Sequence, residues 1–229
     1  MFYSNECNKN ILLNGNITNA ILVLYSIAKH IRENCPNYLN KDGYVNILNV
    51  LNYCEIDMQD CYLNSSQDIF TNEISGYLDV NDYLQNKNKW KIYINTDIGG
   101  LEKRYVLAQT IAFYIIDNIC DKKIRRLCSF PVFTNNNCQL YSDMLASFLL
   151  MPFPEVLKYF NDFRNERKDM PLKVEFIKFL SYKFLITDLQ AAISFEHIRY
   201  LVGILYNNED KIEFVNEKQL LKQYNVLFR

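Results

Sequence analysis

Four side chains stand at the spacing at which helices place the parts of a hydrolytic zinc site. Gln109, Thr110 and Phe113 lie in one helix-like stretch, and Gln139 lies at the start of a second. Two imidazoles at positions i and i+4 share one helical face and can bind one metal ion, and a Glu after the first activates the metal-bound water. A third ligand from another helix completes such a site. This chain has that spacing with different residue types.

The residue types at these positions do not bind zinc. Glutamine is a poor neutral ligand, and a phenylalanine ring cannot ligate at all. The chain has only two histidines, His30 and His197, and neither has a ligand-spaced partner. We therefore predict no catalytic residue, no metal and no cofactor at the vestigial positions Gln109, Thr110, Phe113 and Gln139.

Asp143 follows Gln139 by about one helical turn. A pocket without ligands still contains polar groups, and buried polar groups need hydrogen-bond partners. We expect Gln109, Gln139 and Asp143 to face this pocket and to hydrogen-bond to one another, with Phe113 filling the remaining space.

Two motifs around these positions resemble the ImmA/IrrE-type metallopeptidases. The helix of that family typically has an alanine, then HExxH, then an aromatic residue, and here Ala108 and Tyr114 match the alanine and the aromatic. Residues 139–152 (QLYSDMLASFLLMP) resemble the next motif, which is an acidic ligand, Ala-Asn, Phe-Ala and LLMP. The LLMP element is unchanged, whereas Asp143 replaces the asparagine. The resemblance extends over about residues 15–205, from the first helix through a strand at 92–95 to a helix-turn-helix-like region at 180–198.

The resemblance implies both a fold and a function. The implied fold is α+β and mostly helical, with a small antiparallel sheet packed on a minimal zincin-like helical core. Members of the family regulate phages, mobile elements and stress responses, often by cutting a helix-turn-helix repressor. Because all the ligands are lost together, we expect a pseudo-peptidase that binds a protein partner. Such a repressor is one example of the partner. The pseudo-peptidase would act as an antirepressor-like protein or a toxin–antitoxin component.

Two other function classes stay open. One is a DNA-binding regulator using residues 180–205, although this segment offers an acidic residue and few cations to bases: Gln190, Glu196, His197 and Arg199. Thr187 is expected to be a helix N-cap there. The other is a hydrolase with a non-standard site that uses a cysteine, because a thiolate is a nucleophile. The basic run at 121–128 is expected to be a solvated face.

Apolar periodicity and breakers predict the elements that position these residues. We expect helices at 17–33, 44–52, 101–119, 138–150, 154–166, 172–184 and 188–205, and strands at 68–71, 74–79 and 90–95. The second helix should bury Val45, Ile47, Leu48 and Leu51. Residues 1–205 are predicted to form a peptidase-like domain, and residues 206–229 a C-terminal extension with a strand at 211–215 and a last helix.

Composition limits the class of protein. The chain has 229 residues, 49% of them hydrophobic, which is enough for a sizeable core. Its 25 basic and 26 acidic residues lack the basic excess of a nucleic-acid or membrane-surface protein. With no targeting segment, no membrane span and an odd number of cysteines, we expect a cytoplasmic protein with reduced thiols. Five tyrosines are candidates for an exposed protein-binding surface: Tyr3, Tyr38, Tyr83, Tyr159 and Tyr200.

Overall fold

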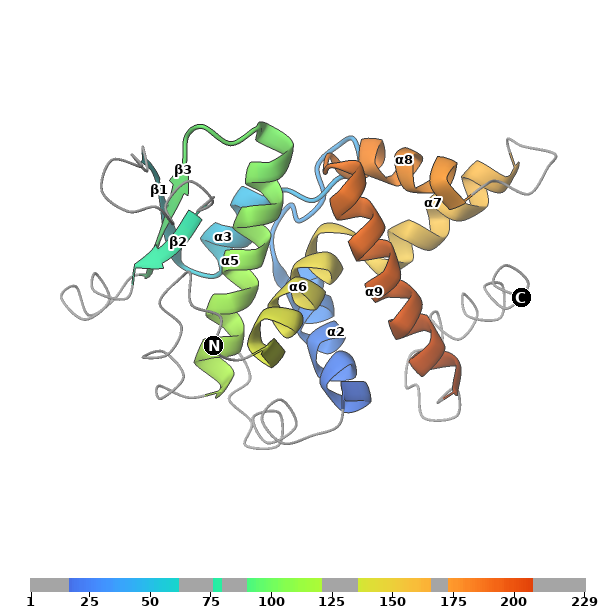
Figure 1. Ribbon diagram of the computed structural model, residues 1–229, viewed down its shortest axis with the longest axis horizontal. Helices are drawn as coiled ribbons and strands as arrows, with labels where there is room; N and C mark the ends of the chain where they lie inside the picture. The colour runs from blue at the N-terminus through green and yellow to red at the C-terminus, as the bar shows by residue number, and fades with distance from the viewer. Residues whose placement is uncertain (1–16, 62–75, 80–89, 121–135, 166–172, 208–229) are drawn as a thin grey trace.

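The computed structural model describes residues 17–61, 76–79, 90–120, 136–165 and 173–207 (Figure 1). At residues 76–79, 90, 117–120, 136–139 and 206–207 it describes the backbone alone. The described part is mostly helical and carries one small sheet. The predicted strands at 68–71 and 211–215, the basic run at 121–128, and Tyr3 and Tyr83 lie outside the described residues.

The first described helix, α2 (Ile17–Asn34), is amphipathic and buries one stripe in the core. Leu24, Ile27 and Ile31 are buried, while Leu22 is half-buried. Tyr25 extends this stripe, since its ring meets Phe148 and Phe153 edge-on.

The next helix, α3 (Ile47–Tyr53), starts later than predicted. Asn46 is its N-cap and accepts a hydrogen bond from the backbone of Asn49, while Val45 forms a bridge with Leu39. Val45, Ile47 and Leu51 are buried as predicted, but Leu48 is 49% exposed. The prediction for Leu48 was wrong because the later start places Val50, rather than Leu48, on the inner face.

The sheet contains β1 (Ile56–Cys61), β2 (Gly76–Asp79) and β3 (Trp90–Asn95) in the order β1-β3-β2. It is mixed rather than purely antiparallel, because the central strand β3 runs parallel to β1 and antiparallel to β2. Strand β1 was not predicted. Its sequence IDMQDC buries Ile56 alone, and the apolar alternation of Ile56 and Met58 stops at Asp60, so it is too short for a strand to be recognised.

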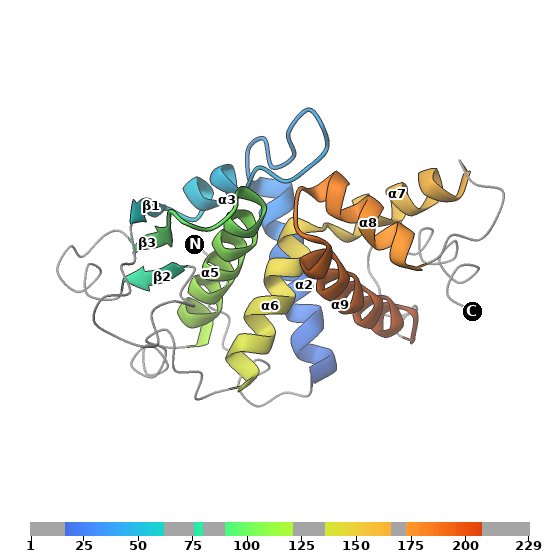
Figure 2. The same ribbon diagram turned by 45° about the horizontal axis from the view of Figure 1, so that its top comes forward.

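Helices α5 (Gly100–Cys120) and α6 (Asn136–Leu150) form the centre of the molecule. Helix α5 packs on β2 and β3, and α6 packs against α5, α2 and α9 (Figures 1 and 2). Both helices bury apolar side chains: Leu107, Ile111, Ile115 and Ile116 on α5, and Leu145, Phe148 and Leu149 on α6.

Three further helices complete the described chain: α7 (Phe153–Asn165), α8 (Lys173–Phe184) and α9 (Asp188–Asn207). An aromatic cluster joins them, in which Phe176 of α8 contacts Phe160 of α7 and Phe195 of α9. Tyr159 belongs to the same cluster and Tyr38 lies in the core, so the expectation that these two tyrosines are exposed was wrong. Tyr200 is exposed, as expected.

Helix ends agree with the predictions to within about two residues from α5 onward. None of the described helices combines the length and the apolar composition needed to cross a bilayer.

Candidate functional site at the contact of α5 and α6

One row of side chains on α5 lies at the margin of the core. Tyr105, Gln109 and Phe113 recur every four residues and are half-buried. The adjoining faces of the helix are buried, with Ala108 and Ile111 fully enclosed. At the edge of the core, α5 therefore presents the amide of Gln109 between the aromatic rings of Tyr105 and Phe113.

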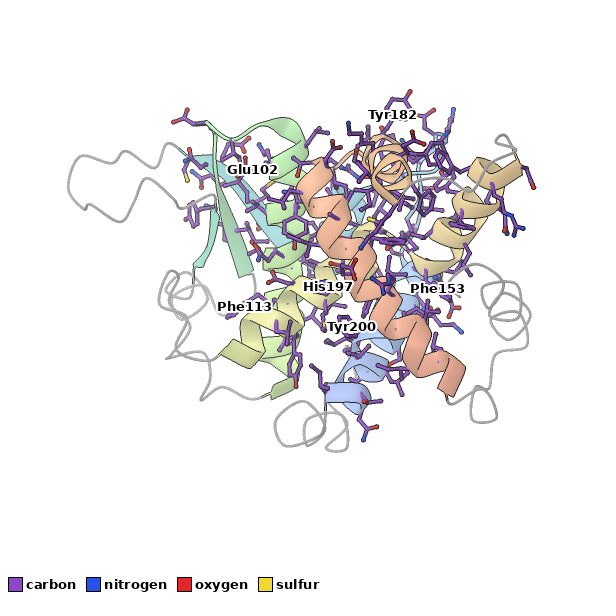
Figure 3. All side chains as sticks on the ribbon, turned by 45° about the vertical axis from the view of Figure 1, so that its right-hand side comes forward. Glu102, Phe113, Phe153, Tyr182, His197 and Tyr200 are labelled. Atoms are coloured by element: carbon purple, nitrogen blue, oxygen red, sulfur yellow. The ribbon has the colours of Figure 1, made fainter. Side chains whose placement is uncertain are left out.

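Asp143 of α6 meets this row. The side-chain nitrogen of Gln109 donates a hydrogen bond to Oδ1 of Asp143 at 2.5 Å, which joins α5 to α6. Figure 3 shows Phe113 on α5 beside α6. Two of the residues predicted for the pocket are thus in contact. Gln139 lies in the first turn of α6, but its side chain is outside the described residues. A pocket lined by all three residues stays a prediction.

Thr110 faces the interior. It is 2% exposed, and its hydroxyl donates to the carbonyl of Val106 at 2.7 Å within the same helix. A general base at this position would need access to a metal-bound water. The Thr110 side chain has no carboxylate that could accept a proton, and it is too buried to reach such a water.

Burial also affects Tyr105, which lies one turn before Gln109 on α5. Burial raises the pKa of Tyr105 well above its usual value, and the charge of Asp143 raises it further. Tyr105 is therefore neutral at physiological pH, and the α5 row carries no charge of its own at Tyr105, Gln109 or Phe113.

A second polar group lies deeper, between α6 and α9, and sequence analysis did not predict it. Ser147 and Ser194 are fully buried, and Ser194 donates to the hydroxyl of Ser147 at 3.1 Å. Ser147 donates to the carbonyl of Asp143 at 2.7 Å and lies 2.9 Å from Nδ1 of His197. Since its one proton goes to Asp143, the Ser147 oxygen accepts from both Ser194 and an Nδ1–H of His197.

His197 is held neutral by this environment. It lies where α9 passes α6 (Figure 3). Burial lowers its pKa to about 4, and the nearby carboxylate of Glu196 only partly opposes this shift. A buried serine beside a neutral histidine has the composition of a nucleophile and base. However, Ser147 is fully enclosed and its proton is bonded to a helix carbonyl, so the pair connects two helices.

The side chains proposed to contact DNA are engaged within the protein. Gln190 and Thr187 form a reciprocal capping box, in which each side chain bonds the backbone N–H of the other residue. Thr187 is thus the N-cap that the sequence predicted. Arg199 donates to Glu196 at 2.7 Å. A helix that reads base edges needs such groups free, so the geometry does not favour duplex recognition.

Cysteine chemistry has little support among the described residues. Cys35 and Cys54 are buried and unpaired, and Cys61 is half-buried. Burial raises the pKa of the Cys54 thiol to about 12, and the neighbouring Cys35 adds to this effect. The described part of the chain has no group of three or more His, Cys, Asp and Glu side chains placed to hold a metal ion.

Comparison with known proteins gives no family. No family model and no curated protein matches the chain.

Proposed function

We propose that this chain is a catalytically inactive, ImmA/IrrE-like protein that binds a protein partner through the α5–α6 contact around Gln109. The hydrogen bond between Gln109 and Asp143 carries the proposal. In zinc sites a ligating imidazole usually donates its second N–H to a carboxylate. Asp143 stands in that relation to position 109, with an amide in place of the imidazole.

The arrangement of the central elements supports the zincin-like part of this proposal. Helix α5 lies against a sheet in which β2 is antiparallel to the central strand, and α6 packs along α5. Residues 109 and 113 share one face of α5, and α6 brings its acidic side chain to that face. These are the elements that a two-helix zinc site requires.

The residue types support inactivity. Position 109 holds an amide, position 113 an aromatic ring, and position 110 a buried hydroxyl already bonded to the backbone. None of these groups is a strong zinc ligand or a general base.

The same row supports binding of a protein. Tyr105 and Phe113 flank Gln109, and all three are half-buried, so part of each side chain faces solvent. Aromatic residues beside a polar anchor are favoured at protein interfaces. The partner we propose is a helix-turn-helix repressor of a phage or mobile element, which this protein would sequester as an antirepressor or within a toxin–antitoxin pair.

Two measurements test the proposal. The first is the zinc content of protein purified without chelator, which we expect to be far below one ion per chain. The second is calorimetric titration of helix-turn-helix repressors encoded beside the gene of this chain. We expect at least one to bind, and Phe113→Arg to weaken that binding at least tenfold because it places a charge in the contact. Tyr182→Ser, an exposed change on α8, is the matched control.

Stoichiometric zinc in the unmodified protein would contradict inactivity. Repressor binding that Phe113→Arg leaves unchanged would contradict the site.

A further inference from the structure

The outer face of α9 carries exposed apolar side chains. Leu189 is 71% exposed, Ile193 38% and Tyr200 64%, and no other described helix has as many large hydrophobic residues this exposed. In Figure 1 no other described element lies in front of α9. Isolated exposed hydrophobic residues are ordinary, but several along one stripe indicate a contact surface.

These residues form one narrow stripe. At 100° per residue, Leu189, Ile193, Glu196, Tyr200 and Gly203 fall within a sector of about 80°. The opposite face of α9 is fixed to the core through buried Ala191 and Ile198, and one side of the helix is fixed by the contact of His197 with Ser147. The outer stripe is therefore held in place and cannot turn inward.

The sizes of the side chains along the stripe are self-complementary. If two copies of α9 pair antiparallel about a two-fold axis at Glu196, position 189 of one copy faces position 203 of the other, and position 193 faces position 199, one residue short of position 200. Leu189 then meets Gly203, where a Cβ atom would have nothing within 4 Å. Ile193 lies beside Tyr200. Leu189 of each copy is thus opposite the open space at Gly203 of the other.

The charges at the centre fit the same pairing. Glu196 accepts hydrogen bonds from Lys173 and Arg199 of its own chain, so its carboxylate is neutralised before a second copy approaches. In the antiparallel pair, Arg199 lies one turn from Glu196 of the other copy and can bond to it as well. Each carboxylate at the axis is therefore beside three cations: Lys173 and Arg199 of its own chain, and Arg199 of the other copy.

We propose that the outer face of α9 is the contact surface between two copies of this chain, paired antiparallel about Glu196. The inference does not depend on the function proposed above. One 20-residue helix per copy, about 30 Å long, gives an interface at the small end of specific contacts. The dimer is accordingly expected to dissociate in the micromolar range, at roughly 10 to 100 µM.

Sedimentation equilibrium of the full chain over a concentration series from about 1 to 500 µM tests the proposal, since this range brackets the expected dissociation constant. The unmodified chain should change from monomer to dimer. Ile193→Lys should weaken the dimer at least tenfold. Gly203→Leu should weaken it as much while leaving the monomer folded, because the new side chain is free of contacts in one copy but meets Leu189 in the pair.

Tyr182→Ser is the control, because Tyr182 is exposed on α8 and lies well away from Tyr200 (Figure 3). It should leave the dimer unchanged. Circular dichroism of each variant checks that the monomer is folded. A register test uses an oxidised mixture of Ile193→Cys and Tyr200→Cys chains, in which we expect cross-links between 193 and 200 to exceed those between two 193 positions.

A chain that stays monomeric over the whole series overturns the proposal. A dimer that Gly203→Leu and Ile193→Lys leave intact overturns it too, and so does cross-linking that favours 193 with 193.

Discussion

Arg104 connects three parts of the chain through one guanidinium group. From α5 it donates to the carbonyls of Leu185 at 3.0 Å and Val45 at 2.8 Å, and its plane lies over the ring of Tyr44. Leu185 lies in the turn between α8 and α9, and Val45 precedes α3. A single side chain thus fixes the positions of two distant loops against the central helix.

We expect Arg104→Met to lower the free energy of unfolding by about 2 to 4 kcal/mol, because it keeps the aliphatic stem and leaves half-buried carbonyls without their donor. Urea unfolding followed by circular dichroism measures the loss. Arg104→Lys is the matched control and should lose less, since it keeps the charge and one donor direction. A loss below about 0.5 kcal/mol in the Met variant would show that water replaces the guanidinium fully.

His197 makes stability depend on pH in a defined direction. Its pKa is lowered from 6.5 to about 4 by burial, so the unfolded chain binds a proton before the folded chain does. The contribution of the neutral ring is complete above pH 6.5 and is lost as the pH falls towards 4, at up to about 1.4 kcal/mol per pH unit.

Unfolding curves at pH 7, 6, 5 and 4 for the unmodified protein and His197→Gln check this expectation. The difference in stability between the two should shrink or reverse as the pH falls, because glutamine does not titrate. If the stability of the two proteins changes with pH in the same way across this range, His197 is not the cause of the pH dependence.

Spacing along the chain decided which contacts at the residue scale could be expected. Gln109 and Asp143 lie on the two helices whose sequences resemble a zinc-peptidase motif, so a contact between them was a natural hypothesis. The bond between Ser147 and His197 joins positions 50 residues apart, and no motif connects them. The sequence indicates this contact only through serines on apolar helices, since a buried hydroxyl needs a hydrogen-bond partner.

Among the elements, α3 ends in an unusual backbone conformation. Glu55, the residue after the C-cap Cys54, has φ 57°. This value lies in the left-handed region, which most residues other than glycine and asparagine disfavour. Its side chain is exposed and contributes little to the core. The strain is therefore confined to the backbone.

We expect Glu55→Gly to raise the free energy of unfolding by about 0.5 to 1 kcal/mol, because glycine adopts this conformation without steric cost. Glu55→Val, a β-branched residue, should lower stability in the same urea assay. If both variants shift stability in the same direction, backbone strain at position 55 is not what limits this helix end.

Helices were predicted better than strands, for a physical reason. Each helix from α5 onward buries apolar residues at a period near 3.6 and has local end signals, such as the Thr187 capping box. Strand β1 buries only Ile56, and its place in the sheet comes from pairing with β3, more than thirty positions later. Parallel pairing of this kind depends on the path of the whole chain and has no local sequence pattern.

At the scale of the whole molecule, α5 and α6 are the central pair, and α2, α3, α9, β2 and β3 pack on one or the other. If they have the geometry of a zinc site, restoring the ligands should restore metal binding. We expect the triple change Gln109→His, Phe113→His and Gln139→Glu to bind one zinc ion per chain. Free zinc at 100 times the dissociation constant would then stabilise the fold by about 2.7 kcal/mol.

Thermal unfolding of this variant with zinc and with EDTA measures the effect, and elemental analysis gives the stoichiometry. Gln109→His alone is the control and should show no difference between the two conditions. A triple variant that binds no zinc would show that the two helices do not converge as a ligand site requires.

Helix α6 packs against both an earlier helix, α2, and a later one, α9, and this order affects folding during synthesis on the ribosome. Tyr38, just after α2, donates its hydroxyl to the carbonyl of Leu149, which is translated 111 positions later. Until α6 has been translated, the apolar stripe of α2 cannot pack against it. Helix α6 in turn cannot complete its packing until α9 has been translated. A nascent chain with such late partners folds largely after most of it has been made, and N-terminal fragments that stop before residue 136 should therefore be the forms that chaperones retain.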